Sequence, residues 1–441
     1  MIKKLLYITS VATLLFTACG KEEQAIPLNP VIKSILPAQG PAKTIVTIKG
    51  KRFSTSADGN IVKFAGINAR VVLATDTLLQ VEAPEDGGTG GITVTVMGRT
   101  SKGPVFSYGE IAIEYINSTY SGAAAGDAIG SLDEARFRSP EGLIMDSKGN
   151  LIVADRGNNR IKMITPTGQV SVIAGSGVAG AVDGAADVAQ FRNPYKVGID
   201  KDDNIYVADN GNHRIRKIAA GTGVVTTIAG SSAGFLDGVG TAARFNGPIA
   251  IATDLNGNIY VADNNNHAVR KIAPSGLVTT IGGNGVTGYS DGVWPNVRFA
   301  NPSGLAVDAN GDVLVADRKN NRIRKITVNT GVVTTIAGTG VRESIDGNGL
   351  KSGFSEPFGI SIDAKGNYYI ADLTSHMLRL MRPSGDVITI GGDGTAGFLD
   401  GGKTGSKYNQ PTDAVADQNG IIFVADLSNA RIRKITPGSP L

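Results

Sequence analysis

The chain has 441 residues, 41% of them hydrophobic and 19% charged, so it holds enough apolar material for a folded core and is not of the disordered class. Its 59 glycines are about twice the usual share of ~7%, and with few aromatic residues they favour short strands and tight turns over long helices or coiled coils. The net charge of +4, with both signs interspersed, lacks the clustered basic surface of a nucleic-acid-binding protein, and a single cysteine excludes internal disulfide bonds and thiolate-rich metal sites.

The first 18 residues have the composition of an export signal. Lys3 and Lys4 precede an apolar run that ends at Phe16, too short for a membrane span, and the only cysteine, Cys19, follows directly. The segment resembles a bacterial lipoprotein signal, although Phe16 stands where that motif prefers Leu. The resemblance implies a lipid anchor on Cys19, a tether over 19–30, and an outer-membrane location facing the cell exterior. The alternative is an ordinary signal peptide with an incidental cysteine.

Residues 31–109 alternate short apolar runs with turn residues, which predicts an immunoglobulin-like sandwich of seven strands. The expected strands are Val31–Leu36, Ile45–Lys49, Ile61–Phe64, Ala69–Leu73, Leu78–Glu82, Ile92–Val96 and Val105–Tyr108. The segments "VIKSILPAQGPAKTIVTIKGKRF" and "LLQVEAPEDGGTGGITVTVMG" resemble the IPT/TIG domain. We expect this domain to serve as a spacer.

One unit recurs six times over residues 111–441. A tripeptide of two apolar residues and Asp ends at positions spaced 54 or 55 apart: Asp155, Asp209, Asp263, Asp317, Asp372 and Asp426. In the second copy it lies within four expected strands, called a to d here: Tyr195–Ile199, Asn204–Ala208, Arg214–Ile218 and Val224–Ala229. Six repeats of four strands predict an all-β, six-bladed propeller.

The repeat also resembles a known family and predicts how the ring closes. "GNHRIRKI" and "NNHAVRKI", after strands of the type "NIYVAD", resemble NHL repeats. The sixth copy ends after its third strand, whereas Ile111–Gly122 lies before the first copy at the distance of a fourth strand. We therefore expect this N-terminal strand to complete the last blade.

Polar residues that recur in every copy favour a structural role. The repeated Asp precedes a short loop and Arg follows it, as Asp209 and Arg214 do, which predicts a turn cap and a cross-strand pair. His213, His267 and His376 share one repeat position, so we expect them to pack or hydrogen-bond in the loop between strands b and c. A metal ion shared by the three histidines is the less favoured alternative, because they lie far apart in the sequence and have no distinctive carboxylate partner. We predict no metal and no cofactor.

Binding residues should lie where the copies differ, on the face that carries the long connectors between blades. The residue after the Pro of strand a is predicted to line the mouth of the central channel, and the set includes Glu141, Tyr195 and Phe358. Next to it, Lys196 and Asp413 replace the Gly or Ala of the other copies. In the connectors, Tyr289 occupies an aromatic slot shared with Phe235 and Phe398, and Trp294 is the only tryptophan.

These residues predict a non-catalytic surface lipoprotein whose propeller binds a glycan or a protein and no nucleic acid. Trp294 is expected either to stack on a sugar ring or to fill a gap between two loops. The alternative function is a hydrolase or lyase like the six-bladed gluconolactonases. The resemblance would then imply a metal centre of several acids, Asn or His at the channel mouth, where only Glu141 is acidic.

Overall fold

A computed structural model describes residues 28–85, 88–108 and 113–438. The leader and Cys19 lie outside these ranges, so the predictions made for them stay predictions. Strands β1 to β8 form one compact unit and strands β9 to β35 another. Among the described residues, no helix has the length and hydropathy needed to cross a membrane.

The first unit contains all seven strands that the sequence predicts, six of them within two residues at their ends, whereas the last begins at Arg99 instead of Val105. An eighth, two-residue strand pairs parallel to the last one. The sheet runs in the order β1-β3-β6-β5-β4-β7-β8-β2 and encloses a core in which Phe64 and Phe106 meet edge to face at 5.1 Å. The strands are β1 (Val31–Leu36), β2 (Gln39–Gly40), β3 (Ile45–Lys51), β4 (Ile61–Phe64), β5 (Ile67–Ala74), β6 (Leu78–Glu82), β7 (Gly90–Val96) and β8 (Arg99–Tyr108), with a 3-10 turn at η1 (Ala57–Gly59).

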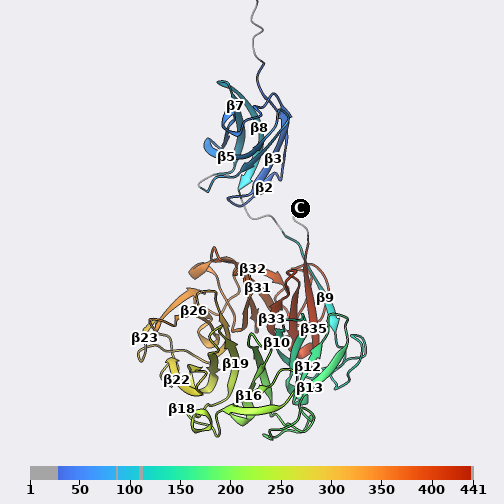
Figure 1. The fold of residues 1–441 in the computed structure, drawn as a ribbon, viewed down its shortest axis with the longest axis vertical. Helices are drawn as coiled ribbons and strands as arrows, with labels where there is room; N and C mark the ends of the chain where they lie inside the picture. The colour runs from blue at the N-terminus through green and yellow to red at the C-terminus, as the bar shows by residue number, and fades with distance from the viewer. Residues whose placement is uncertain (1–27, 86–87, 109–112, 439–441) are drawn as a thin grey trace, which may run out of the picture. The chain divides into compact units, whose positions relative to one another are not determined.

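The second unit is the six-bladed propeller that the repeats predict (Figure 1). In every blade, strands a, b and c pair antiparallel in chain order. The first blade consists of β10 (Pro140–Met145), β11 (Leu151–Asp155), β12 (Arg160–Ile164) and β13 (Val170–Ala174); the second consists of β14 (Pro194–Ile199), β15 (Ile205–Asp209), β16 (Arg214–Ile218) and β17 (Val225–Ala229).

Blades three to five gain a short fifth strand, which the sequence analysis did not predict. Residues of the connector fold back and pair with the outer strand of the blade that follows. The strands of blade three are β18 (Gly238–Val239), β19 (Pro248–Thr253), β20 (Ile259–Asp263), β21 (Ala268–Ile272) and β22 (Leu277–Gly282); those of blade four are β23 (Gly292–Val293), β24 (Pro302–Val307), β25 (Val313–Asp317), β26 (Arg322–Thr327) and β27 (Val332–Ala337); those of blade five are β28 (Gly347–Asn348), β29 (Pro357–Ile362), β30 (Tyr368–Asp372), β31 (Met377–Met381) and β32 (Asp386–Gly391).

The N-terminal strand completes the last blade, as the sequence predicts. Strand β9 (Tyr115–Ser121) pairs antiparallel with β35 (Arg431–Pro437), beside β34 (Ile422–Asp426) and β33 (Pro411–Ala416). Figure 1 shows β9 next to β35, although more than 300 residues separate them in the chain. The ring is therefore closed by hydrogen bonds between the two ends of the repeat array.

The propeller core lies between neighbouring blades. An aromatic residue ahead of strand a is fully buried in all six copies: Phe137, Phe191, Phe245, Phe299, Phe354 and Tyr408. Burying one such side chain stabilises the fold by about 1.5–3 kcal/mol. Because the chain direction alternates, the a–b and c–d turns emerge on one side, called the a–b face here, and the b–c and d–a connections on the other, called the b–c face.

Candidate functional site

The side chains predicted to line the channel mouth are mostly buried. The six positions after the Pro of strand a face the neighbouring blade, and five of them are at most 4% exposed: Glu141, Ile249, Ser303, Phe358 and Thr412. Only Tyr195 is half-buried. A ligand on the b–c face could therefore touch Tyr195 directly, whereas contact with Glu141 or Phe358 would require other side chains to move.

Lys196 and Asp413 form an ion pair inside the channel. Lys196 Nζ lies 3.0 Å from Asp413 Oδ1 and donates to the Thr412 carbonyl at 3.2 Å, and the Leu143 amide donates to Asp413 Oδ2 at 3.0 Å. The other four copies have Gly or Ala at this position. At Gly359 a Cβ would lie only 2.8 Å from Lys196 Nζ, so the small residues make room for the pair. The two non-repeated charges thus neutralise each other and fill the channel.

Glu141 is a buried carboxyl next to this pair. Its Oε2 lies 3.3 Å from Arg156 Nε and has no hydrogen-bond partner among the described residues. Burial raises the pKa of Glu141 to about 7, against the attraction of Arg156 and Lys196. Arg156 also donates to the Tyr195 hydroxyl at 3.3 Å and lies 4.9 Å above its ring.

Phe358 lies between two cations beside the ion pair of Lys196 and Asp413. Lys196 Nζ is 5.3 Å from its ring centroid and Arg318 Cζ is 5.4 Å from it. Arg318 is held in turn by Glu356 at 2.7 Å. The structure thus brings five of the predicted site residues together. Their polar and cation–π contacts are mainly with one another and with neighbouring arginines, and these residues are Glu141, Tyr195, Lys196, Phe358 and Asp413.

Tyr289 and Trp294 lie elsewhere, at the outer edge of blade four, where strand β23 lies. Arg322 stacks on the Tyr289 ring at 4.0 Å, and the Tyr289 hydroxyl lies 3.0 Å from Thr335 Oγ1. Phe398 occupies the same repeat slot and is covered in the same way by Arg431 at 4.0 Å. Tyr289 therefore packs its own loop.

Phe235 is the third aromatic residue of this slot; it is exposed to about the same extent as Tyr289 and Phe398, but no guanidinium stacks on its ring at 4.0 Å. Blade three has Ala268 where Arg322 and Arg431 stand, so only Arg270, 5.1 Å from the ring centroid, approaches it. Phe235 is 41% exposed and Trp294 is 51% exposed. Both line a shallow pocket of about 270 Å³ together with Leu236, Asp237, Thr280 and Asn284. The sequence analysis did not name Phe235 as a site residue. The substitution of Ala268 for the arginine of blades four and six could have pointed to it.

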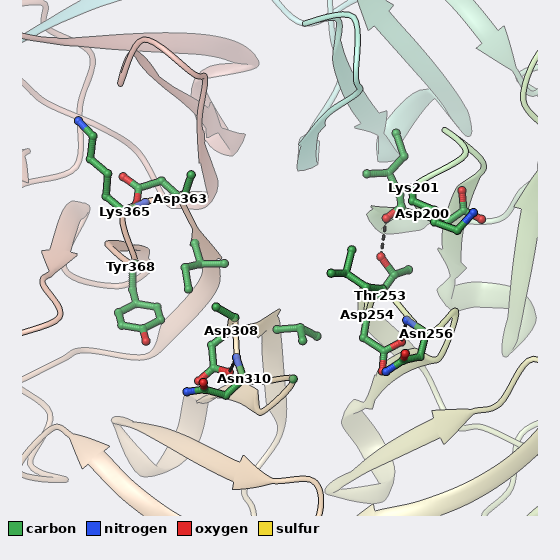
Figure 2. A pocket seen from close by; sticks show the side chains of 18 of the residues that line it. Asp200, Lys201, Thr253, Asp254, Asn256, Asp308, Asn310, Asp363, Lys365 and Tyr368 are labelled. Atoms are coloured by element: carbon green, nitrogen blue, oxygen red, sulfur yellow. Dashed lines mark hydrogen bonds between the residues drawn. The ribbon is translucent and has the colours of Figure 1, made fainter.

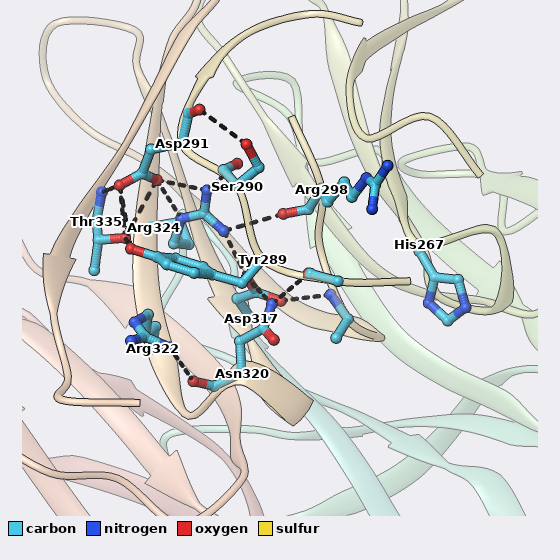
Figure 3. A network of polar contacts seen from close by, with 12 residues as sticks. His267, Tyr289, Ser290, Asp291, Arg298, Asp317, Asn320, Arg322, Arg324 and Thr335 are labelled. Carbon is cyan, nitrogen blue, oxygen red and sulfur yellow. Dashed lines mark hydrogen bonds and ion pairs between the residues drawn. The ribbon is translucent and has the colours of Figure 1, made fainter. Parts of the chain in front are cut away.

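The repeated aspartates are structural. Asp317 is fully buried, accepts from the Ala300 amide at 2.8 Å and from the Asn320 side chain at 2.8 Å, and pairs with Arg324 at 2.7 Å. Arg324 also binds Asp291 of the connector, and Figure 3 shows this network. The predicted partner is corrected: Asp209 lies opposite Arg214 in register, but it binds the buried Arg216 at 2.8 Å instead.

The histidines join neighbouring blades. Nδ1 of each accepts a backbone amide of the next blade: His213 from Gly247, His267 from Asn301 and His376 from Gln410, at 3.0–3.1 Å. Asn159 and Asn321 replace His in two other blades, and their Oδ1 atoms make the same bond. No group of three or more His, Cys, Asp or Glu in the described ranges is arranged to hold a metal ion.

Comparisons with known proteins agree with this architecture. The IPT/TIG domain family matches residues 30–108, and the NHL repeat matches residues 137–162, 191–218, 245–272 and 299–326. The chain is an IPT/TIG domain followed by an NHL-repeat propeller. The four matched repeats are blades one to four, and blades five and six follow the same strand pattern.

Relatives of this IPT/TIG–NHL chain are distant. NHL repeat-containing protein 2 of Bos taurus is 27% identical over 393 residues, covering 79% of this chain and 54% of that protein. The chain thus spans about half the length of the curated relatives it matches. A Bacteroides thetaiotaomicron structural-genomics protein of unknown function has a TM-score of 0.58 at 23% identity, covering 93% of this chain and 98% of that one. An auxiliary nutrient binding protein of the same organism has a TM-score of 0.57 at 17% identity, with the same coverage. At these identities the likeness shows the fold alone.

Proposed function

We propose that this protein is a lipid-anchored binding protein of the cell surface and that the b–c face of its propeller binds a carbohydrate. The observation that carries the proposal is the pocket between Phe235 and Trp294. The fold shared with an auxiliary nutrient binding protein supports a binding role at the level of architecture only.

The chemistry of this pocket suits a sugar ring. Aromatic side chains that stay about half-exposed leave apolar area in water, which a ligand with an apolar face can cover. A sugar has such C–H faces and carries hydroxyls at its edge. Thr280 and Asn284 line the same pocket. The Thr280 hydroxyl donates to Asp237 at 3.0 Å and the Asn284 amide to the Pro295 carbonyl at 3.1 Å, which leaves Thr280 Oγ1 as an acceptor and the second N–H of Asn284 as a donor for sugar hydroxyls. The stacking alternative for Trp294 is therefore favoured over the packing alternative.

The test is titration calorimetry or affinity electrophoresis against a panel of polysaccharides. Trp294→Ala is expected to weaken binding about thirtyfold, the loss of roughly 2 kcal/mol at a central aromatic anchor, and Phe235→Ala to weaken it as well. Phe398→Ala is the matched control, because it removes the same repeat aromatic from a slot that Arg431 covers. Full affinity in Trp294→Ala, or binding to a protein partner and to no glycan, would overturn the proposal.

The anchor is tested separately. Cys19→Ala should release the protein from the membrane fraction, since acylation of that thiol supplies the lipid. A variant that fractionates like the natural chain would refute the lipoprotein assignment. That result would not bear on the carbohydrate proposal, because the two are tested by different variants.

A further inference from the structure

A large cavity opens on the a–b face, opposite the pocket of Trp294. It encloses about 950 Å³ where the a–b turns of blades two to five meet, and Figure 2 shows the turn residues around it. A smaller cavity of about 180 Å³ shares Ile199, Thr253, Val307 and Ile362 with it and ends at Lys196 and Asp413. We call the two together the funnel. The ion pair forms its floor.

The mouth of the funnel is acidic. The turns place four carboxylates there: Asp200, Asp254, Asp308 and Asp363. Each folds back on its own turn; Asp254 accepts two backbone amides through Oδ1 and the Asn258 and Tyr260 side chains through Oδ2. Although burial opposes it, these bonds lower the pKa of Asp254, so the carboxylate is charged at neutral pH. The carboxylates therefore set the local potential while their oxygens are already engaged.

Residues that break the repeat supply free hydrogen-bonding groups. Tyr368 begins strand b in blade five, where the other five copies have a buried aliphatic residue: Leu151, Ile205, Ile259, Val313 and Ile422. Its ring lies between the turns of Asp363 and Asp308 (Figure 2), and its hydroxyl bonds to none of the described residues. Deeper down, the Ser361 hydroxyl is buried and has no partner in the described part of the chain.

We propose that the funnel binds a hydroxyl-rich molecule of one or two sugar units that carries an amine rather than a carboxylate. Tyr368 offers one aromatic face for the apolar side of a sugar ring, and Ile199, Val307 and Ile362 continue the apolar wall. Asn256, Asn310 and the Ser361 hydroxyl face the sugar hydroxyls. The volume lies in the usual range of small-molecule sites.

The charge balance selects the substituent. Lys201 and Lys365 are the basic residues that line the mouth against the four carboxylates, and Lys201 is paired with Asp202 at 2.8 Å. Lys325 pairs with Asp308 and with Asp312, at 2.8 Å each, so its single charge is shared between two carboxylates and the mouth stays acidic. An ammonium group gains from this potential without displacing any turn hydrogen bond. A carboxylate on the ligand would be repelled by the four aspartates, which cannot move away because the turns hold them.

The experiment is titration calorimetry of the purified chain with three disaccharides: diglucosamine, cellobiose and digalacturonate. Diglucosamine is expected to bind at least about tenfold more tightly than digalacturonate at low salt, and the ratio should shrink in about 0.5 M salt because the carboxylates are screened. Tyr368→Val should weaken diglucosamine about tenfold. This variant takes the residue of blade four, Val313, so the fold should hold, and a melting curve checks it.

The funnel does not depend on the proposed carbohydrate pocket between Phe235 and Trp294, and Trp294→Ala separates the two sites. Binding that is lost in Tyr368→Val and unchanged in Trp294→Ala supports the funnel. Binding lost only in Trp294→Ala overturns the funnel proposal and supports the pocket of Trp294. A preference for digalacturonate, equal affinity for all three sugars, or no binding of diglucosamine at millimolar concentration overturns the funnel proposal as well.

Discussion

Lys196 and Asp413 show both the reach and the limit of reading single residues. The sequence marks them as departures from the repeat and predicts that both charges lie at the channel. It does not show that the two side chains meet, because blade one lies between their blades and the contact depends on the radius of the ring. Their exposures of 5% and 8% make the pair structural.

Breaking this pair should cost more than removing it. Asp413→Ala leaves Lys196 buried without its counter-charge, so we expect a loss of about 3–5 kcal/mol of unfolding free energy. Adding Lys196→Ala should recover much of that loss, because Ala250 already occupies this position in blade three. Denaturant unfolding of both single variants and the double variant measures the coupling energy. Strictly additive losses would show that the pair is not coupled.

The aromatic slot shows how a neighbouring position decides the role of a residue. The sequence places Phe235, Tyr289 and Phe398 at equivalent sites and therefore predicts one common role. The guanidinium that stacks on Tyr289 and Phe398 is replaced by Ala268 in blade three, and Phe235 lines a pocket together with Trp294. A comparison of the copies at the aromatic position alone could not detect this difference, because it lies at a second repeat position.

At the scale of the element, the strands were predictable and their additions were not. Blades repeat a pattern of buried β-branched residues between turn residues, and six aligned copies locate strand ends better than one. Strands β18, β23 and β28 have two residues each and no hydrophobic period. Their pairing arises because a connector runs back along an outer edge, which is a tertiary effect.

The contacts between blades predict a dependence on pH. Burial lowers the pKa of His213, His267 and His376 below the ordinary 6.5, and each Nδ1 accepts an amide only when it is unprotonated. The unfolded chain then binds more protons, so these bonds are fully present above pH 6.5 and are lost as the pH falls through the folded pKa values. A triple His→Asn variant should lose less melting temperature between pH 7.5 and 5 than the natural chain, since Asn159 makes the same bond.

Asn159→His is the matched opposite variant and should steepen the loss of melting temperature on acidification. Equal pH profiles in the natural chain, the triple variant and Asn159→His would contradict the role of the histidines. The comparison uses differences between variants, so the titration of other buried groups such as Glu141 cancels.

At the scale of the whole molecule, ring topology was predictable from spacing, but the position of the cavity on the a–b face was not. Long connectors led to the expectation that the b–c face binds, and the pocket of Trp294 does lie among them. The a–b turns are short and repeat closely, so nothing in their length marks a site. Residues of strand a from all six blades line the smaller cavity of the funnel, so this cavity is a property of the closed ring.

Closure itself gives the last prediction. Deleting residues 115–121 removes β9, opens the edge of β35 and takes away Asn117, which is 1% exposed and accepts from the Tyr408 hydroxyl at 2.5 Å. An open edge and a blade of three strands should lower the melting temperature by well over the roughly 2–4 °C that 1 kcal/mol represents in a domain of 150–250 residues, and should promote aggregation. A synthetic peptide of residues 113–122 should restore part of the loss by adding the missing strand. Removal of residues 31–108 is the control, since it deletes a separate unit and leaves the ring whole. A β9 deletion that melts like the control and stays monomeric would show that the ring does not need this strand.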